Sequence, residues 1–177
     1  MRIAREKRKQ NIIEYILYMY QVEDTIRACN FDMEQLEQRV ILQYKVSEKE
    51  KQEVRNWYSD IILMMHEEGI KQSGHMSMLN QLIDELQSLH SKLLNEIRDT
   101  KYTQQYGFAL QNIRELEKKL GDKPESDIQT CLNALYALLL LRLQKKTISQ
   151  ETMEAMQTFS NLLGLLAAWF KKQEEAR

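Results

Sequence analysis

The fold class is decided by the stretch Ile12-Ile-Glu-Tyr-Ile-Leu-Tyr-Met-Tyr-Gln-Val-Glu-Asp-Thr-Ile-Arg-Ala-Cys29, which contains neither glycine nor proline. Its apolar side chains recur at steps of three and four residues, the spacing of one face of an α-helix. The members of this stripe are Ile12, Tyr15, Ile16, Met19, Val22, Ile26 and Cys29. A helix is therefore predicted over about Ala4–Cys29. Asn30 ends it, because asparagine tolerates the left-handed conformation of a C-terminal cap.

Residues that interrupt helices are scarce along the whole chain. The first glycine is Gly69, and Pro124 is the single proline among 177 residues. Since glycine and proline are the poorest helix formers, the sequence predicts an all-α protein. The apolar stripes divide into about seven helices, which short connections would join into a compact, mostly antiparallel bundle.

Local signals place most of the helix boundaries. Asp32 with Gln35 and Ser47 with Glu50 match capping boxes. The other boundary residues are Gly69 followed by Ile70 as a Schellman stop, Gly107 as a bend, Gly121 as a stop, Pro124 in the first turn of the sixth helix and Ser149 as the cap of the last helix. Leu138–Leu141 lie in the sixth helix, which is apolar most of the way round and is predicted to be central and buried.

Composition favours one soluble domain over residues 1–177. Hydrophobic residues make up 43% of the chain, enough for a core, and no stretch rich in Pro, Gly or Ser forms a linker. The most apolar stretches, Ala134–Leu141 and Leu162–Phe170, fall short of the roughly 20 residues that cross a bilayer. Because no secretory signal is recognisable either, the expected location is the cytoplasm. Cys29 and Cys131 are expected to pack as small hydrophobes, although a disulfide between them stays open.

The histidines do not match a metal site. A carboxylate-bridged di-iron bundle needs Glu three residues before His, and those positions hold Leu63, Gln72 and Gln87. There is no nucleophile elbow and no phosphate-binding glycine loop. We therefore expect no cofactor, no metal and no enzymatic activity. His90, among leucines, is predicted to be a satisfied half-buried residue, whereas His75, near Gly74, is predicted to be solvated.

The N-terminus carries a cluster of basic residues, formed by Arg2, Arg5, Lys7, Arg8 and Lys9. On a helix these side chains could contact the phosphates of nucleic acid or lipid. A solvated, frayed N-terminus is the simpler interpretation. The 25 basic and 26 acidic residues give a net charge of −1, which argues against a protein built around polyanion binding.

A polar stripe follows the basic cluster, with Asn11, Glu14, Tyr18, Gln21 and Thr25 spaced three and four apart. Such a stripe could line a groove or contact a partner, or could consist of ordinary surface pairs. The candidate partner-binding residues are Arg2, Arg5, Arg8, Lys9, Glu14 and Tyr18.

Two stretches resemble a known family. The opening Arg2-Ile-Ala-Arg-Glu-Lys-Arg-Lys-Gln-Asn-Ile-Ile-Glu-Tyr15, continuing through Tyr20-Gln-Val-Glu-Asp24, is similar to an uncharacterised family of small bacterial helical proteins classed as a domain of unknown function. The later stretch Ile148-Ser-Gln-Glu-Thr-Met-Glu-Ala-Met156 resembles the C-terminal region of the same family. The resemblance implies a bacterial, soluble, all-helical protein and carries no catalytic residue.

These features favour a helical interaction protein that binds another protein or itself. The sixth helix and the stretch Leu162–Phe170 with Trp169 are more apolar than one inward face requires, and an uncovered remainder would favour a partner. A nucleic-acid-associated protein using the basic N-terminal helix is the alternative. An enzyme built from distant residues, such as Glu14, Tyr18 and His90, ranks third.

Overall fold

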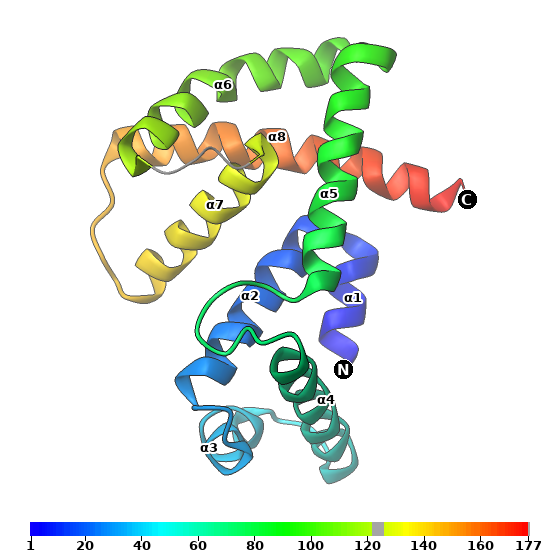
Figure 1. The fold of residues 1–177 in the computed structure, drawn as a ribbon, viewed down its shortest axis with the longest axis vertical. Coiled ribbons are helices and arrows are strands. Elements are labelled where there is room, and N and C mark those ends of the chain that lie inside the picture. The colour runs from blue at the N-terminus through cyan, green and yellow to red at the C-terminus, as the bar shows by residue number, and fades with distance from the viewer. Residues whose placement is uncertain (122–125, 177) are drawn as a thin grey trace. The chain divides into compact units, whose positions relative to one another are not determined.

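The structure is a computed structural model that describes residues 1–121 and 126–176, where the chain forms helices and connections without a strand (Figure 1). The α-helices are α1 (Arg2–Gln10), α2 (Ile12–Ala28), α3 (Met33–Arg39), α4 (Glu48–Glu67), α5 (Ser77–Lys92), α6 (Thr100–Leu120), α7 (Asp127–Leu143) and α8 (Gln150–Glu175). A short 3₁₀ turn, η1 (Ile41–Gln43), follows α3, and a π turn, η2 (Leu93–Ile97), extends α5. The all-α class is confirmed.

The predicted first helix is two helices, which explains why eight α-helices occur in the described residues where about seven were predicted. α1 ends at Gln10 and α2 begins at Ile12. Between them, the Asn11 side-chain oxygen accepts a hydrogen bond from the Ile13 N–H at 2.9 Å. Asparagine competes for backbone donors in this way, and it is among the preferred residues at helix starts. The prediction of one continuous helix was wrong at this residue.

Several predicted boundaries are confirmed by their hydrogen bonds. Ser47 and Glu50 form the full capping box before α4. Gly69 and Ile70 form the predicted Schellman stop, with the Ile70 N–H donating to the Met65 carbonyl at 3.1 Å. Asp32 caps α3, but the Gln35 side chain donates to the Asp32 carboxylate and does not accept the Asp32 N–H, which donates to the Cys29 carbonyl, so this capping box is incomplete.

The later boundaries differ in part from the prediction. α6 runs through Gly107 and stops at Gly121. Arg98 adopts a left-handed conformation with φ 54° after the π turn, and the Asp99 side chain caps α6. α7 begins at Asp127 with Ser126 as its cap, whereas Pro124 lies outside the described residues. Ser149 caps α8 as predicted.

Backbone contacts group the chain into two compact units. The first comprises residues 1–9 and 14–80, and the second comprises residues 10–13 and the described residues from 81 onward. In the first unit α3, η1 and α4 pack on one another, and in the second α6, α7 and α8 do so. The most deeply buried side chains include Ile16, Met19, Tyr20, Leu36 and Met65 in the first unit, and Leu86, Tyr102, Ile113 and Phe159 in the second. The single domain over residues 1–177 stays a prediction.

Gly107 inside α6 and Gly121 at its C-cap are predicted to respond oppositely to alanine. A Cβ atom at Gly107 or Gly121 would meet no other atom within 4 Å, so packing does not decide the outcome. Gly107→Ala, inside the helix, should raise the free energy of unfolding by about 0.5–1 kcal/mol. Gly121→Ala, at φ +69°, should lower it by about 1–2 kcal/mol. Urea unfolding measures both, and changes of the same sign would contradict the assigned backbone conformations.

Candidate functional site

The basic N-terminal cluster is partly neutralised by carboxylates. The Arg2 guanidinium lies 3.4 Å from the Glu6 carboxylate and 3.9 Å from that of Glu50. The Lys7 ammonium donates a hydrogen bond of 3.3 Å to Glu14. Such exposed pairs add little stability. They nevertheless reduce the positive field that a polyanion would meet.

The structure brings some of the candidate partner-binding residues together and leaves others apart. The Lys7 ammonium lies 5.9 Å above the ring of Tyr18, so Glu14 and Tyr18 meet the same lysine. The Tyr18 hydroxyl donates to the Met1 sulfur at 3.5 Å, and burial, with a smaller effect of Tyr44, raises its pKa. Arg8 lies over the Tyr15 ring at 5.9 Å, whereas Arg5 and Lys9 are exposed.

A small pocket of about 180 Å³ lies beside α1 and the start of α4. Its apolar lining comes from Met1, Ile3, Tyr44, Val46 and Val54, and its charged lining from Arg2, Arg5, Glu50 and Glu53. Arg2 and Arg5 therefore share one pocket, while the other four candidates line no part of it. Partner binding by the six residues stays a prediction.

Two residues of the polar stripe hydrogen-bond to the backbone of α2. Asn11 is used to cap the helix, and the Thr25 hydroxyl donates to the Gln21 carbonyl of its own helix at 2.7 Å. Glu14 remains exposed. The side chains at the two ends of the stripe, Asn11 and Thr25, therefore form hydrogen bonds with the helix backbone.

A buried carboxylate in α2 was missed by the sequence reasoning. Glu23 is 0% exposed. One of its oxygens accepts the Met76 N–H at 2.9 Å, and the other lies 2.5 Å from Nδ1 of His75. The His75 ring stacks on the buried Tyr20 ring with centroids 3.5 Å apart. His75 is therefore a partly buried partner of Glu23, and the prediction that it is solvated was wrong.

Arg27 extends this contact along the connection between α4 and α5. Its guanidinium donates to Asp24 at 2.9 Å, to the Ile70 carbonyl at 3.2 Å and to the Gly74 carbonyl. We call Glu23, Arg27, His75 and Met76 the α2 clasp. A signal for it exists in the sequence, because Glu23 interrupts the apolar stripe three residues before Ile26.

The α2 clasp is predicted to stabilise the first unit strongly. Glu23→Ala removes the partner of the half-buried His75 and leaves the buried Met76 N–H without its acceptor. This change should lower the free energy of unfolding by about 1–3 kcal/mol. Glu14→Ala, on the same helix but in an exposed pair, should cost about 0–1 kcal/mol. Equal effects in urea unfolding would contradict the role of the clasp.

A polar network attaches the first turn of α7 to α6. The Tyr106 hydroxyl donates to Asp127 at 2.6 Å, and Arg114 donates to the same carboxylate at 2.8 and 3.2 Å. His90 lies beside it, with Nδ1 2.7 Å from the Tyr102 hydroxyl and its ring edge-on to Tyr106. His90 has a hydrogen-bond partner, as predicted. It is more deeply buried than expected, at 3% exposure.

Burial sets the ionisation of this network. It lowers the pKa of His90 from 6.5, and the nearby Asp127 opposes that change. Burial and the hydrogen bond to Asp127 raise the pKa of Tyr106 to about 12. His90 is therefore a neutral group that holds α5 against α6.

The neutral His90 predicts a pH dependence of stability. Below pH 6.5 the unfolded chain binds a proton at His90 that the folded protein excludes, so the free energy of unfolding falls as pH falls. The slope from one such group is at most about 1.4 kcal/mol per pH unit. His90→Gln should flatten the profile below about pH 6.5, which urea unfolding at several pH values measures. Profiles of the same shape in both proteins would contradict the assignment.

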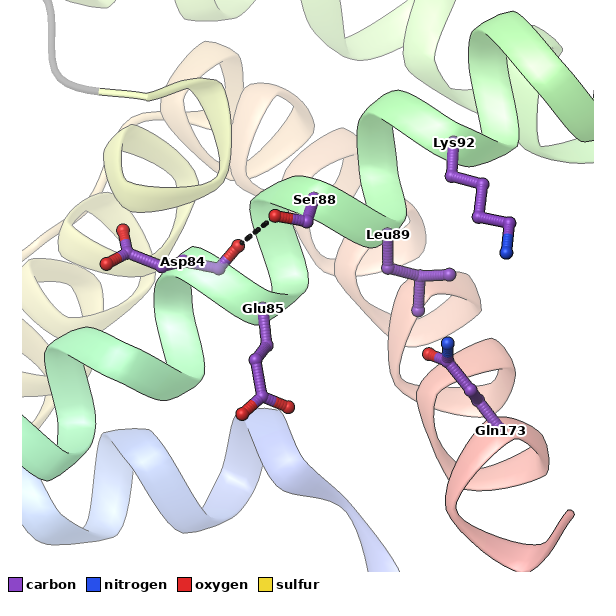
Figure 2. Close-up of a pocket in the computed structure, with 6 residues that line it drawn as sticks. All are labelled: Asp84, Glu85, Ser88, Leu89, Lys92 and Gln173. Atoms are coloured by element: carbon purple, nitrogen blue, oxygen red, sulfur yellow. Dashed lines mark hydrogen bonds between the residues drawn. The ribbon is translucent and has the colours of Figure 1, made fainter. Parts of the chain in front are cut away.

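An open groove lies between α5 and the C-terminal part of α8. Figure 2 shows the groove, about 300 Å³ in volume and lined by Asp84, Glu85, Ser88, Leu89, Lys92 and Gln173. An adjoining hollow of about 220 Å³ adds Ile97, Trp169 and Lys172. The Lys172 ammonium lies 5.0 Å above the Trp169 ring. The groove thus has an apolar middle with two acids at one end and two lysines at the other.

The C-terminal end of α7 is apolar and partly exposed. The helix packs against α6 and α8, and its buried residues extend only to Leu138. Leu141 is 39% exposed and Leu143 is 63% exposed, while Leu139 and Leu140 are half-buried. The prediction of a central, buried helix was therefore wrong for the end of α7, because the neighbouring helices bury it only as far as Leu138.

The stretch Leu162–Phe170 is mostly buried, in contrast to the second half of α7. Leu162, Leu163, Leu166 and Phe170 are buried, and Trp169 is half-buried. Cys29 and Cys131 are free and buried, in agreement with their expected packing as small hydrophobes.

Two features of the described residues concern metals and membranes. In residues 1–121 and 126–176, no three His, Cys, Asp or Glu side chains are grouped so as to hold a metal ion. Within the same part of the chain, no helix has both the length and the apolar character needed to cross a bilayer.

Comparison with known proteins places the chain in a family. A family model described as Domain of unknown function (DUF4924) matches residues 1–177, and the protein belongs to this family. No curated protein and no solved structure matches the chain. The resemblance to a helical family of unknown function is thereby confirmed, whereas a bacterial origin stays a prediction.

Proposed function

We propose that this protein is a helical interaction module that binds another protein, in the first place a second copy of itself, through the end of α7. The observation that carries this proposal is the exposure of Leu141 and Leu143 beside the half-buried Leu139 and Leu140. We call these four leucines the α7 patch.

The α7 patch differs from two exposed apolar residues on other helices. Leu63 in α4 and Phe108 in α6 are exposed singly, as is usual on a protein surface. The patch instead gathers four leucines around one helix end, and several exposed apolar side chains close together favour association. Complete burial of one leucine side chain contributes about 1.5–3 kcal/mol. A partner that covers the patch would therefore form a complex stabilised by a comparable free energy for each leucine that becomes fully buried.

Nucleic-acid association through α1 is the second candidate. Arg5 and Lys9 are exposed and could contact phosphates. The ion pairs of Arg2 with Glu50 and of Lys7 with Glu14 weaken the case for nucleic-acid binding, because carboxylates already neutralise those two cations.

The broader setting of the module is proposed from the sequence. The protein is bacterial, acts in the cytoplasm, needs no cofactor and has no catalytic activity. The resemblance to small bacterial helical proteins supports the first statement, the free buried Cys29 and Cys131 suit a reducing compartment, and the absence of catalytic motifs supports the last two.

Substitution of the α7 patch tests the proposed function. Light scattering should give a mass above the 21.1 kDa of one chain for the unmodified protein. The double variant Leu141→Ser, Leu143→Ser should return the mass to 21.1 kDa, because the apolar contact is lost. Leu63→Ser, which changes a leucine of similar exposure in α4, is the control and should leave the mass unchanged. A mass of 21.1 kDa for the unmodified protein at every concentration would contradict self-association.

A further inference from the structure

We propose that the hollow between the end of α5 and the C-terminal part of α8 binds a small organic acid, that is, a carboxylate attached to an apolar body. The hollow has a volume of about 220 Å³ and lies within the second unit. It shares no residue with the α7 patch, so this inference goes beyond the proposed function. Its lining residues are Leu89, Lys92, Ile97, Trp169, Lys172 and Gln173.

The hollow offers apolar surface that a ligand can reach. Ile97 is 43% exposed and Trp169 is half-buried, whereas Leu89 is buried. Ile97 and Trp169 therefore provide area that the apolar part of a ligand would remove from water. The volume is smaller than that of most pockets for drug-sized ligands, and it suits one ring or a short acyl chain.

A π turn brings Ile97 to the hollow. Positions eight residues apart, such as Leu89 and Ile97, lie about 80° apart around a regular α-helix. The π turn η2 rotates less per residue than an α-helix, so Ile97 comes to line the same hollow as Leu89 and Lys92. The turn ends at Arg98, which is left-handed with φ 54°. Single π turns of this kind are frequent at functional sites.

Two lysines make the hollow positive. Lys92 belongs to α5 and Lys172 to α8, and Figure 2 shows Lys92 extending from α5 on the side of Gln173. Among the described residues no acid lines the hollow, and neither ammonium has a carboxylate of this part of the chain at ion-pair distance. The Lys172 ammonium instead lies 5.0 Å above the Trp169 ring. Two cations on different helices can bind one anion between them.

The apolar wall and the two lysines together define the ligand class. A carboxylate between Lys92 and Lys172 would accept charge-assisted hydrogen bonds from both, and the Gln173 amide is a further donor. The apolar body then lies against Ile97 and Trp169. The adjoining groove carries its two acids at the other end, where they would repel the carboxylate and keep it beside the lysines.

A titration followed by nuclear magnetic resonance tests this inference in the unmodified protein. The chain has two tryptophans, so the indole N–H of Trp57 in α4 is an internal control for that of Trp169. Either 3-phenylpropionate or octanoate should shift the Trp169 signal saturably and leave the Trp57 signal in place. A dissociation constant on the order of 1 mM is attainable for so few ligand atoms. The two probes distinguish an aromatic body from an acyl chain, and saturation by either supports the proposal.

Removal of the charges tests the role of the lysines. The variant Lys92→Met, Lys172→Met keeps two apolar side chains and should raise the dissociation constant about tenfold or more, because the carboxylate loses two charge-assisted hydrogen bonds. The control Lys118→Met, Lys119→Met makes the same change in net charge on α6 and should leave the constant within about twofold. The neutral probe 3-phenylpropanamide should bind about tenfold more weakly than the acid. Circular dichroism confirms that each variant folds.

Three results would overturn the inference. The first is a Trp169 signal that neither acid shifts at concentrations up to about 10 mM. The second is equal binding of the acid and the amide, or equal binding by the unmodified protein and the lysine variant, because the lysines would then not hold the carboxylate. The third is binding to vesicles of phosphatidylserine and phosphatidylcholine without binding of either acid, with loss in the lysine variant, which would make the occupant an anionic lipid surface.

Discussion

The proposed function depends on one mismatch between a helix and its neighbours. α7 carries leucines around most of its circumference, but α6 and α8 bury it only as far as Leu138. Asp127 fixes the first turn through Tyr106 and Arg114, so that the covered half is the N-terminal one. Since apolar surface is driven out of water, the remaining half favours a contact that one chain does not supply.

Polar groups inside the two units have a different role from the exposed leucines. Glu23 and His90 are buried, and each has a partner from another segment: His75 and Met76 for Glu23, and Tyr102 for His90. A buried polar group is costly unless it is paired, so each fixes the position of the segment that it bonds. We interpret both as structural groups that hold connections and helices in place.

Sequence reasoning succeeded where the physical cause is local. Ser47 with Glu50 and Gly69 with Ile70 act within one helical turn, so their spacing alone predicts the capping box and the Schellman stop. The helix break at Asn11 was missed because the apolar stripe continues across it. The Asn11 side chain competes for a backbone donor, and this effect leaves no trace in the stripe. The contact of Glu23 with His75 joins residues 52 positions apart, which no periodicity reveals. The apolar character of α7 can be read from its sequence, but the burial of its residues depends on how far α6 and α8 extend along the helix.

Hydrogen–deuterium exchange of α7 at low and high protein concentration tests the central claim most directly. If the α7 patch is an interface, amides of residues 139–146 should exchange more slowly at high concentration, while those of α4 should not change. Exchange in residues 139–146 that is the same at both concentrations, in a sample whose mass shows association, would contradict the account.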